Sequence, residues 1–168
     1  MVEMIRVAGI NKNDMVNGEG VSVSLFLQGC PFHCKGCHNP ETWNSDGGDI
    51  WNEEDLTKNI IEALTENNIY RNLSILGGEP LDTPQKREYI TKLIKEVKKI
   101  SPEIKICIWT GYLYETLINV HDDNMKYILN NINYLIDGEF RIKERDITLK
   151  WRGSRNQRII DMKNRKLV

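Results

Sequence analysis

The chain has 168 residues, which is enough for one ordinary hydrophobic core, and we expect residues 1–168 to form a single domain. Hydrophobic residues make up 40% and charged residues 28% of it, a balance that argues against a disordered or membrane-embedded protein. The formal net charge of −1 provides no general attraction to nucleic acid or to a membrane surface, so we expect neither as a partner. The N-terminus shows no basic start followed by a long apolar run, which predicts cytoplasmic localisation.

The first third of the chain predicts two strands and a helix. The segments 5–10 and 22–28 are rich in β-branched and aromatic residues and are bounded by glycine and asparagine, which is typical of strands. Between them, the sequence NGEG at 17–20 is either an ordinary turn or a lip of a site, and we favour the turn. A helix is expected from about residue 53 to 67, with Asn52 as its N-cap and apolar residues at helical spacing.

The middle of the chain repeats a strand-loop-helix pattern. Residues 72–76 predict a short strand that ends at Gly77 and Gly78, and Pro84 can begin an amphipathic helix. The next expected elements are a strand, a helix and a strand, at 103–110, 124–131 and 132–137. Such alternation implies an α/β fold in which a curved, mainly parallel sheet with outer helices curls into a partial (βα) barrel. The loops that follow the strands should line the functional face.

From residue 138 onward the pattern changes. The stretch is rich in charged residues and carries no clean helical stripe, so we expect a C-terminal extension, 138–168, rather than a second domain. Three arginines within it, Arg152, Arg155 and Arg158, form either a solvated basic face or part of the site. The sequence alone leaves both interpretations open.

Three of the four cysteines, Cys30, Cys34 and Cys37, share one short segment with C-x3-C-x2-C spacing, directly after the second predicted strand. In a reducing compartment such clustering indicates metal binding rather than disulfides. Three thiolates can hold a 4Fe-4S cluster and leave one iron without a protein thiolate, open to another ligand. On spacing alone, the alternative is a structural zinc site completed by His33 or His38.

The fourth cysteine, Cys107, is far from the others in the sequence. It alternates with Ile106 and Ile108 in an expected strand, which predicts a small buried hydrophobic residue rather than a ligand. Zinc ribbons generally draw their ligands from two separated pairs, and Cys107 by itself completes no second pair. The spacing therefore favours iron-sulfur chemistry over zinc.

The cysteine segment resembles the radical S-adenosylmethionine (SAM) superfamily, whose signature is this same spacing in the loop after the first barrel strand. The resemblance implies that Cys30, Cys34 and Cys37 ligate one 4Fe-4S cluster and that SAM is the second cofactor. In that superfamily the amino and carboxylate groups of SAM chelate the unique iron, and an electron from the cluster breaks a sulfonium C–S bond to yield a 5'-deoxyadenosyl radical. An aromatic residue often precedes the last cysteine there, where this chain has Gly36.

The segment LGGEP, after a predicted strand, resembles the GGE motif that holds the amino group of SAM in the same superfamily. A Gly-Gly-Glu-Pro turn taken alone is an ordinary tight loop, in which glycines let a ligand approach the backbone closely. Beside the cysteines, the resemblance implies that Gly78 and Glu79 contact SAM, with Glu79 accepting from the amino group. It also implies cofactor contacts by the residues at the last cysteine, Gly36, Cys37 and His38.

Two further segments narrow the resemblance to the glycyl-radical enzyme activases, and among them to the family that serves anaerobic ribonucleoside-triphosphate reductases. CHNPETW (37–43) is similar to the segment that follows the last cysteine in the activases, and a glycine before that cysteine is usual in this family. LIDGEF (135–140) and WRGSRNQRIID (151–161) are similar to its closing segment.

This resemblance implies an oxidoreductase with two protein partners. One is the large anaerobic reductase subunit, a glycyl-radical protein whose glycine loses a hydrogen atom, and the other is reduced flavodoxin or ferredoxin as electron donor. No classical acid-base pair is required for this chemistry. Two alternatives stay open: another radical SAM enzyme, either a different glycyl-radical activase or one with a small-molecule substrate, and a zinc-stabilised interaction module.

Overall fold

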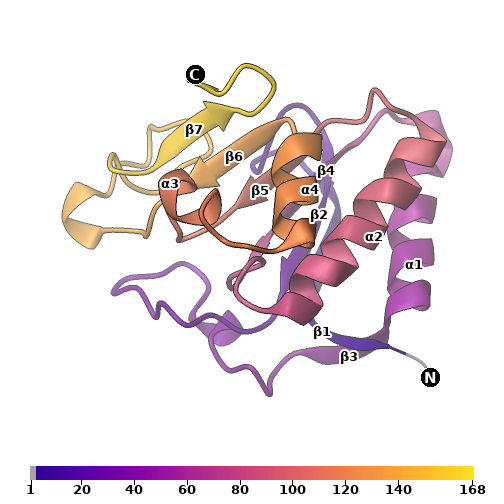
Figure 1. Ribbon diagram of the computed structural model, residues 1–168, viewed down its shortest axis with the longest axis horizontal. Helices are drawn as coiled ribbons and strands as arrows, with labels where there is room; N and C mark the ends of the chain where they lie inside the picture. Colours follow the sequence, from indigo (N-terminus) through magenta and orange to yellow (C-terminus); the bar gives the residue numbers. More distant parts are fainter. Residues whose placement is uncertain (1–2) are drawn as a thin grey trace.

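The computed structural model describes residues 3–168, which are built around an open sheet of eight strands (Figure 1). From edge to edge the strand order is β3-β1-β2-β4-β5-β6-β7-β8. The central strands pair in parallel and are β2 (Ser22–Leu27), β4 (Asn72–Gly77), β5 (Ile106–Trp109) and β6 (Tyr134–Asp137). The outer strands pair antiparallel and are β1 (Met4–Asp14), β3 (Asp49–Asn52), β7 (Arg158–Asp161) and β8 (Lys166–Leu167).

The three long helices all lie on one face of the sheet, as Figure 1 shows. They are α1 (Glu53–Thr65), α2 (Pro84–Ile100) and α4 (Asp123–Asn131). Right-handed crossovers that step in one direction along a parallel sheet place their helices on the same side. Each helix begins where a side chain accepts from its first backbone N–H groups, and these N-caps are Asn52, Thr83 and Asp122. Within residues 3–168, no helix is long and apolar enough to cross a membrane.

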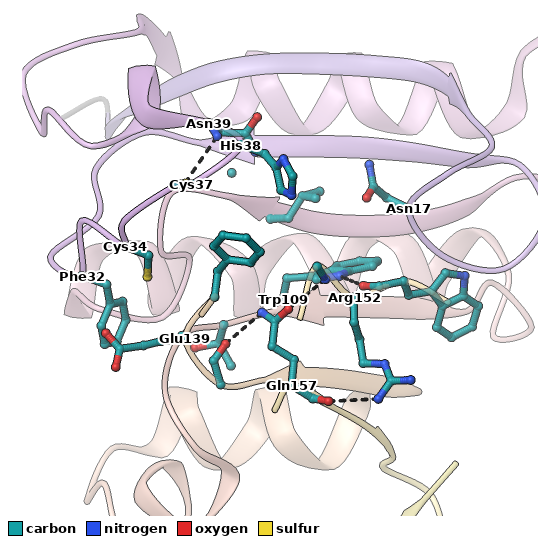
Figure 2. Close-up of a pocket in the computed structure, with 18 of the residues that line it drawn as sticks. Asn17, Phe32, Cys34, Cys37, His38, Asn39, Trp109, Glu139, Arg152 and Gln157 are labelled. Carbon is teal, nitrogen blue, oxygen red and sulfur yellow. Dashed lines mark hydrogen bonds between the residues drawn. The ribbon is translucent and has the colours of Figure 1, made fainter. Parts of the chain in front are cut away.

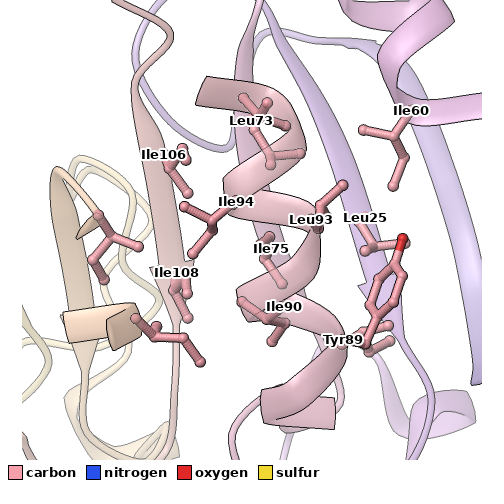
Figure 3. Close-up of a cluster of buried hydrophobic side chains, with 14 of the residues drawn as sticks. Leu25, Ile60, Leu73, Ile75, Tyr89, Ile90, Leu93, Ile94, Ile106 and Ile108 are labelled. Atoms are coloured by element: carbon pink, nitrogen blue, oxygen red, sulfur yellow. The ribbon is translucent and has the colours of Figure 1, made fainter. Parts of the chain in front are cut away.

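The hydrophobic core fills the space between the sheet and these helices. Leu25, Ile75 and Ile108, on three neighbouring strands, face Ile90 and Ile94 of α2 (Figure 3). All five side chains are fully buried. Because successive side chains of a strand point to opposite faces, the residues between these positions must face away from the helices. The opposite face of the sheet is therefore free to form a site.

Most of the predicted elements of the middle of the chain are confirmed. The strands expected at 22–28 and 72–76 match β2 and β4, and the helices expected at Asn52 and at Pro84 match α1 and α2. The strand expected over 103–110 is shorter, however, because a turn after α2 occupies its first residues. The short helix α3 (Tyr114–Leu117), a single turn, was not predicted.

The expectation of a mainly parallel sheet is corrected at the two edges, where four of the seven strand pairings are antiparallel. Residues 138–168 contribute β7, which pairs antiparallel with β6, and β8, which pairs with β7, so this segment enlarges the sheet. The strand β3 was also missed. These strands have only two to four residues, too few to show a period-two pattern, and their pairing depends on partners remote in the sequence.

Candidate functional site

A cavity of about 610 Å³ lies on the face of the sheet opposite the three long helices. Its floor comes from the central strands, where Phe26, Leu76 and Trp109 face away from the core. Its rim comes from the loops after β2, β4, β5 and β6, so it lies at the carboxyl ends of the parallel strands. Figure 2 shows the cysteine loop on one side of this cavity and Arg152 and Gln157 on the other. Loops at the carboxyl ends of parallel strands are the usual place for ligands in α/β proteins.

The three clustered cysteines all line this cavity. Cys30, Cys34 and Cys37 lie on the loop that leaves β2, and each is partly exposed to the cavity. The loop turns back on itself through a hydrogen bond from the Cys37 N–H to the Cys34 carbonyl, 3.0 Å long. A second one runs from the Asn39 N–H to the Cys37 sulfur at 3.4 Å. The structure thus brings together the three thiols that the spacing singled out.

The three thiols line one cavity, so they face a common space. Among the described residues, no three histidine, cysteine or acidic side chains converge closely enough to hold one metal ion. A cubane asks for something different, because each cysteine binds a separate iron and the sulfurs need only face a common space. Burial raises the pKa of Cys30 and of Cys34, so metal binding at these thiols must displace protons. The donor set therefore fits a three-cysteine 4Fe-4S cluster.

The two histidines of the zinc alternative lie in different places. His33 stacks on Trp43, with ring centroids 4.8 Å apart and an interplanar angle of 15°, and it does not line the cavity of the cysteines. His38 does line that cavity. Cys107 lies in β5, 2% exposed, and burial raises its pKa to about 12. Its expected place as a small buried hydrophobic residue is confirmed.

The Gly78 turn packs directly against the start of the cysteine loop. The Gly78 N–H donates to the Leu27 carbonyl and the Glu79 N–H donates to the Gly29 carbonyl, each at 2.9 Å. A Cβ atom at Gly78 would lie 2.4 Å from the Gly29 oxygen. The close approach that requires a glycine here is therefore to the chain's own backbone, and Gly78 lines the cavity besides.

Glu79 is the buried acid of the site. Its side chain is 1% exposed and accepts hydrogen bonds from the Leu81 N–H (3.0 Å), the Thr110 hydroxyl (2.8 Å) and the Gly111 N–H (2.7 Å). Burial raises its pKa to about 7 even though these three donors favour the ionised form. The carboxylate is thus held in one orientation at the cavity wall, where it can accept from a cationic group.

The opposite wall comes from the segment after β6. The ring of Phe140 lies 5.3 Å from that of His38, and a Cβ atom at Gly153 would lie 2.9 Å from Phe140. Gly36 does not line the cavity, unlike the other expected cofactor contacts. A Cβ atom there would lie 2.7 Å from Ile142, so this wall packs too closely for a larger residue before the last cysteine.

Thr110 and Gly111 were not predicted to line the cavity, and for the segment 17–20 we favoured a simple turn. Thr110 and Gly111 follow β5, and the rule that loops after parallel strands line the site could have found them. Asn17 lines the cavity while its carbonyl accepts from the Ser74 hydroxyl at 2.8 Å, so the segment 17–20 is both a bend and a lip of the site.

The three arginines separate into different environments. Arg152 lines the cavity and donates to the Gln157 carbonyl at 3.1 Å. Arg158 instead pairs with the fully buried Asp137, with 3.0 Å between Nε and Oδ1. Arg155 has an exposed side chain. No pattern in the sequence distinguishes these three, because the distinction depends on which way β7 and its preceding loop face.

Comparisons with known proteins point in the same direction as this geometry. A family model described as a 4Fe-4S single cluster domain matches residues 16–160, a range that includes the three cysteines and Glu79. The chain is 38% identical over 145 residues to the anaerobic ribonucleoside-triphosphate reductase-activating protein of Vibrio cholerae, which covers 86% of this chain and 90% of that relative. Proteins of the same name from phage T4 (38% over 148 residues, 87% of each chain) and Escherichia coli K12 (36% over 145 residues, 86% and 90%) are similar to it as well.

Proposed function

Because this chain belongs to the family of anaerobic ribonucleoside-triphosphate reductase-activating proteins, we propose that it is the activase of such a reductase. It is an oxidoreductase of the radical SAM type, and it generates the glycyl radical on the large reductase subunit. The observation that carries the proposal is the shared cavity, in which Cys30, Cys34 and Cys37 face the same space as Glu79.

The three cysteines, on the loop that follows β2, would hold one 4Fe-4S cluster. Since the thiols rather than the thiolates are favoured by burial, the folded apo-protein keeps Cys30 and Cys34 protonated, and these protons leave on ligation. Such a cluster, when bound and reduced, would supply the one electron that reductive cleavage of SAM requires, and hydrogen transfer from a glycine Cα of the partner would leave methionine, 5'-deoxyadenosine and the glycyl radical.

Glu79 and its neighbours would orient SAM. The Glu79 carboxylate is fixed by donors from two loops and would accept from the SAM amino group, while Gly78 leaves the wall free of a side chain. His38 and Cys37, on the facing loop, are the other proposed contacts. Gly36 acts indirectly, because it lets the cysteine loop pack against the segment around Ile142.

The remaining cavity walls suit radical chemistry on a protein substrate. Phe26, Leu76, Trp109 and Phe140 provide apolar surface, which limits water near a reactive radical. Ile147 lies at the lip and is 84% exposed, which leaves an apolar edge for an entering loop of the reductase. The chain's own residues thus bind, orient and shield, and no acid-base pair is needed.

Three finer features belong to the same proposal. The parallel centre of the sheet, with helices outside and the site on the other face, is consistent with the partial barrel of the radical SAM type. The segment 138–168 adds strands to the same sheet, which supports one domain over residues 1–168. Reduced flavodoxin or ferredoxin is the proposed electron donor, and three free thiols on one loop favour a reducing compartment such as the cytoplasm.

The deciding experiment combines metal analysis with spectroscopy under anaerobic conditions. We expect about four irons per chain after reconstitution. With SAM and a reductant, we expect methionine release and, on addition of the reductase, a glycine-centred radical in the electron paramagnetic resonance spectrum. SAM cleavage without a glycine radical would favour a radical SAM enzyme with another substrate. Colourless protein with one zinc and no iron would reject the cluster and favour an interaction module.

A further inference from the structure

A buried lysine lies directly behind the proposed cofactor site. Lys86, in the first turn of α2, is only 8% exposed. Its Nζ donates three hydrogen bonds, to the Gly29 carbonyl (3.0 Å), the Glu79 carbonyl (2.8 Å) and the Asp82 carboxylate (2.8 Å). An ammonium group has three protons, so its donor capacity is used completely. A lysine is rarely buried to this extent unless its environment is built for it.

The two carbonyl groups that Lys86 joins belong to the two halves of the site. Gly29 directly precedes Cys30, and Glu79 carries the carboxylate proposed to accept from SAM. The backbones of these loops already touch, through the hydrogen bond from the Glu79 N–H to the Gly29 carbonyl. Lys86 adds a second connection from the helix side, because one ammonium group contacts both carbonyl oxygens.

Resting on the proposed function, we propose that Lys86 is a positioning residue that holds the Cys30 loop and the Glu79 turn at the separation SAM requires. SAM must reach the cluster and the Glu79 carboxylate at the same time, so the two loops have to keep one spacing. Groups that bind a ligand lose affinity steeply when the surrounding residues no longer hold them in place. Asp82 balances the charge of Lys86, with 2.8 Å between the charged atoms, so the role is mechanical rather than a net positive charge at the cluster.

The test is the affinity of the reconstituted holoenzyme for SAM in the Lys86→Met variant. Methionine has a side chain of similar length but donates no hydrogen bond, so both carbonyl contacts are lost. We expect wild-type iron content and a SAM dissociation constant weakened about tenfold, measured by isothermal titration under anaerobic conditions. The matched control is Lys99→Met, on the same helix with a side chain 71% exposed, which should bind SAM within about twofold of wild type.

The outcomes separate a positioning role from a structural one. A lysine that only stabilised the fold would lower the unfolding temperature and leave the SAM affinity of the reconstituted fraction unchanged. SAM affinity within about twofold of wild type in Lys86→Met with full iron content therefore overturns the inference. Should Lys86→Met not fold, Lys86→Leu, which also donates no hydrogen bond, takes its place with the same criterion. A wild-type protein that holds no iron-sulfur cluster or binds no SAM rejects the proposed function itself, which is a distinguishable result.

Discussion

The two walls of the cavity contact their neighbouring segments in different ways. The wall formed by the cysteine loop and the Glu79 turn is tied by backbone hydrogen bonds, such as those from Gly29 to Thr42 (2.6 Å) and from Glu79 to Gly29. The wall formed by residues 138–157 also has backbone hydrogen bonds within itself, but it meets the cysteine loop through side chains, among them Phe140 against His38. Backbone contacts tolerate most substitutions of neighbouring side chains, whereas side-chain contacts do not.

This difference suggests a division of labour between the walls (Figure 2). The first wall carries the groups that every step of the proposed chemistry needs. The second wall covers them and presents exposed residues such as Ile147 toward the outside. Substitutions in the first wall should therefore abolish activity or alter the pH dependence of stability. Substitutions in the second wall should have smaller effects, on stability or on partner recognition.

The largest effect is expected from Cys34→Ala, which removes one proposed ligand from the first wall. Iron content should fall well below about four per chain and SAM cleavage should be lost, since two thiolates cannot hold the cubane in place. The control is Cys107→Ala in β5, which should keep full iron content because Cys107 lies outside the cavity. Iron analysis and methionine release measure both. Full SAM cleavage by Cys34→Ala would refute the ligand assignment.

A second effect concerns the buried Glu79 and pH. Its folded-state pKa of about 7 lies above the ordinary value of 4.5, so the folded state binds this proton more tightly than the unfolded state. The protonated carboxyl therefore contributes about 3 kcal/mol to the free energy of unfolding. This contribution is fully present below pH 4.5 and is lost as the pH rises through 7. Urea unfolding of the apo-protein between pH 4.5 and 8 measures it.

The same titration in Glu79→Gln isolates this carboxyl group. The variant should lose that part of the pH dependence, because glutamine does not titrate. Glu96→Gln, at a surface position on α2, should keep the wild-type slope. Identical slopes in Glu79→Gln and the wild type would mean that burial does not govern this group.

The second wall should be destabilised when Arg158, which pairs with Asp137, is replaced. Substitution to Met leaves the fully buried Asp137 without its cation. We expect the free energy of unfolding to fall by about 2 kcal/mol, which is less than for a fully buried ion pair because the Arg158 side chain is 31% exposed. Arg155→Met, at an exposed side chain of the same segment, should change the unfolding free energy by less than about 0.5 kcal/mol. Denaturant unfolding compares the two. Equal effects would show that the 138–157 wall does not depend on the Asp137 pair.

The smallest effect on the fold is expected at Ile147, on the exposed edge of the cavity. Ile147→Asp should leave stability and partner-free SAM cleavage near wild type, because the side chain is 84% exposed. Glycyl-radical formation on the reductase should fall several-fold, since a charge replaces apolar surface where we propose that the reductase loop enters. Leu167→Asp, also exposed but in β8 and outside the cavity lining, is the control. Unchanged radical yield in Ile147→Asp would remove this lip from the partner interface.

The cluster loop and the central fold could be predicted because their signals are local. The spacing of Cys30, Cys34 and Cys37 lies within one loop, and the strands β2 and β4 and the helices α1 and α2 each show their own periodicity and caps. A thiolate cluster needs only residues that are neighbours in the sequence, so no knowledge of tertiary contacts was necessary. The motif of its own turn singled out Glu79, and the structure places this residue at the cavity wall.

The other features depend on residues that are far apart in the chain. Lys86 contacts Gly29 across 57 positions, and on the sequence it is one of many lysines of an amphipathic helix. The strand β7 is recognisable only beside β6, where Arg158 meets Asp137, and Gly36 is required only because Ile142 packs on it. Short strands, buried charges and close packing are decided by what lies opposite, and that partner is chosen only when the chain folds.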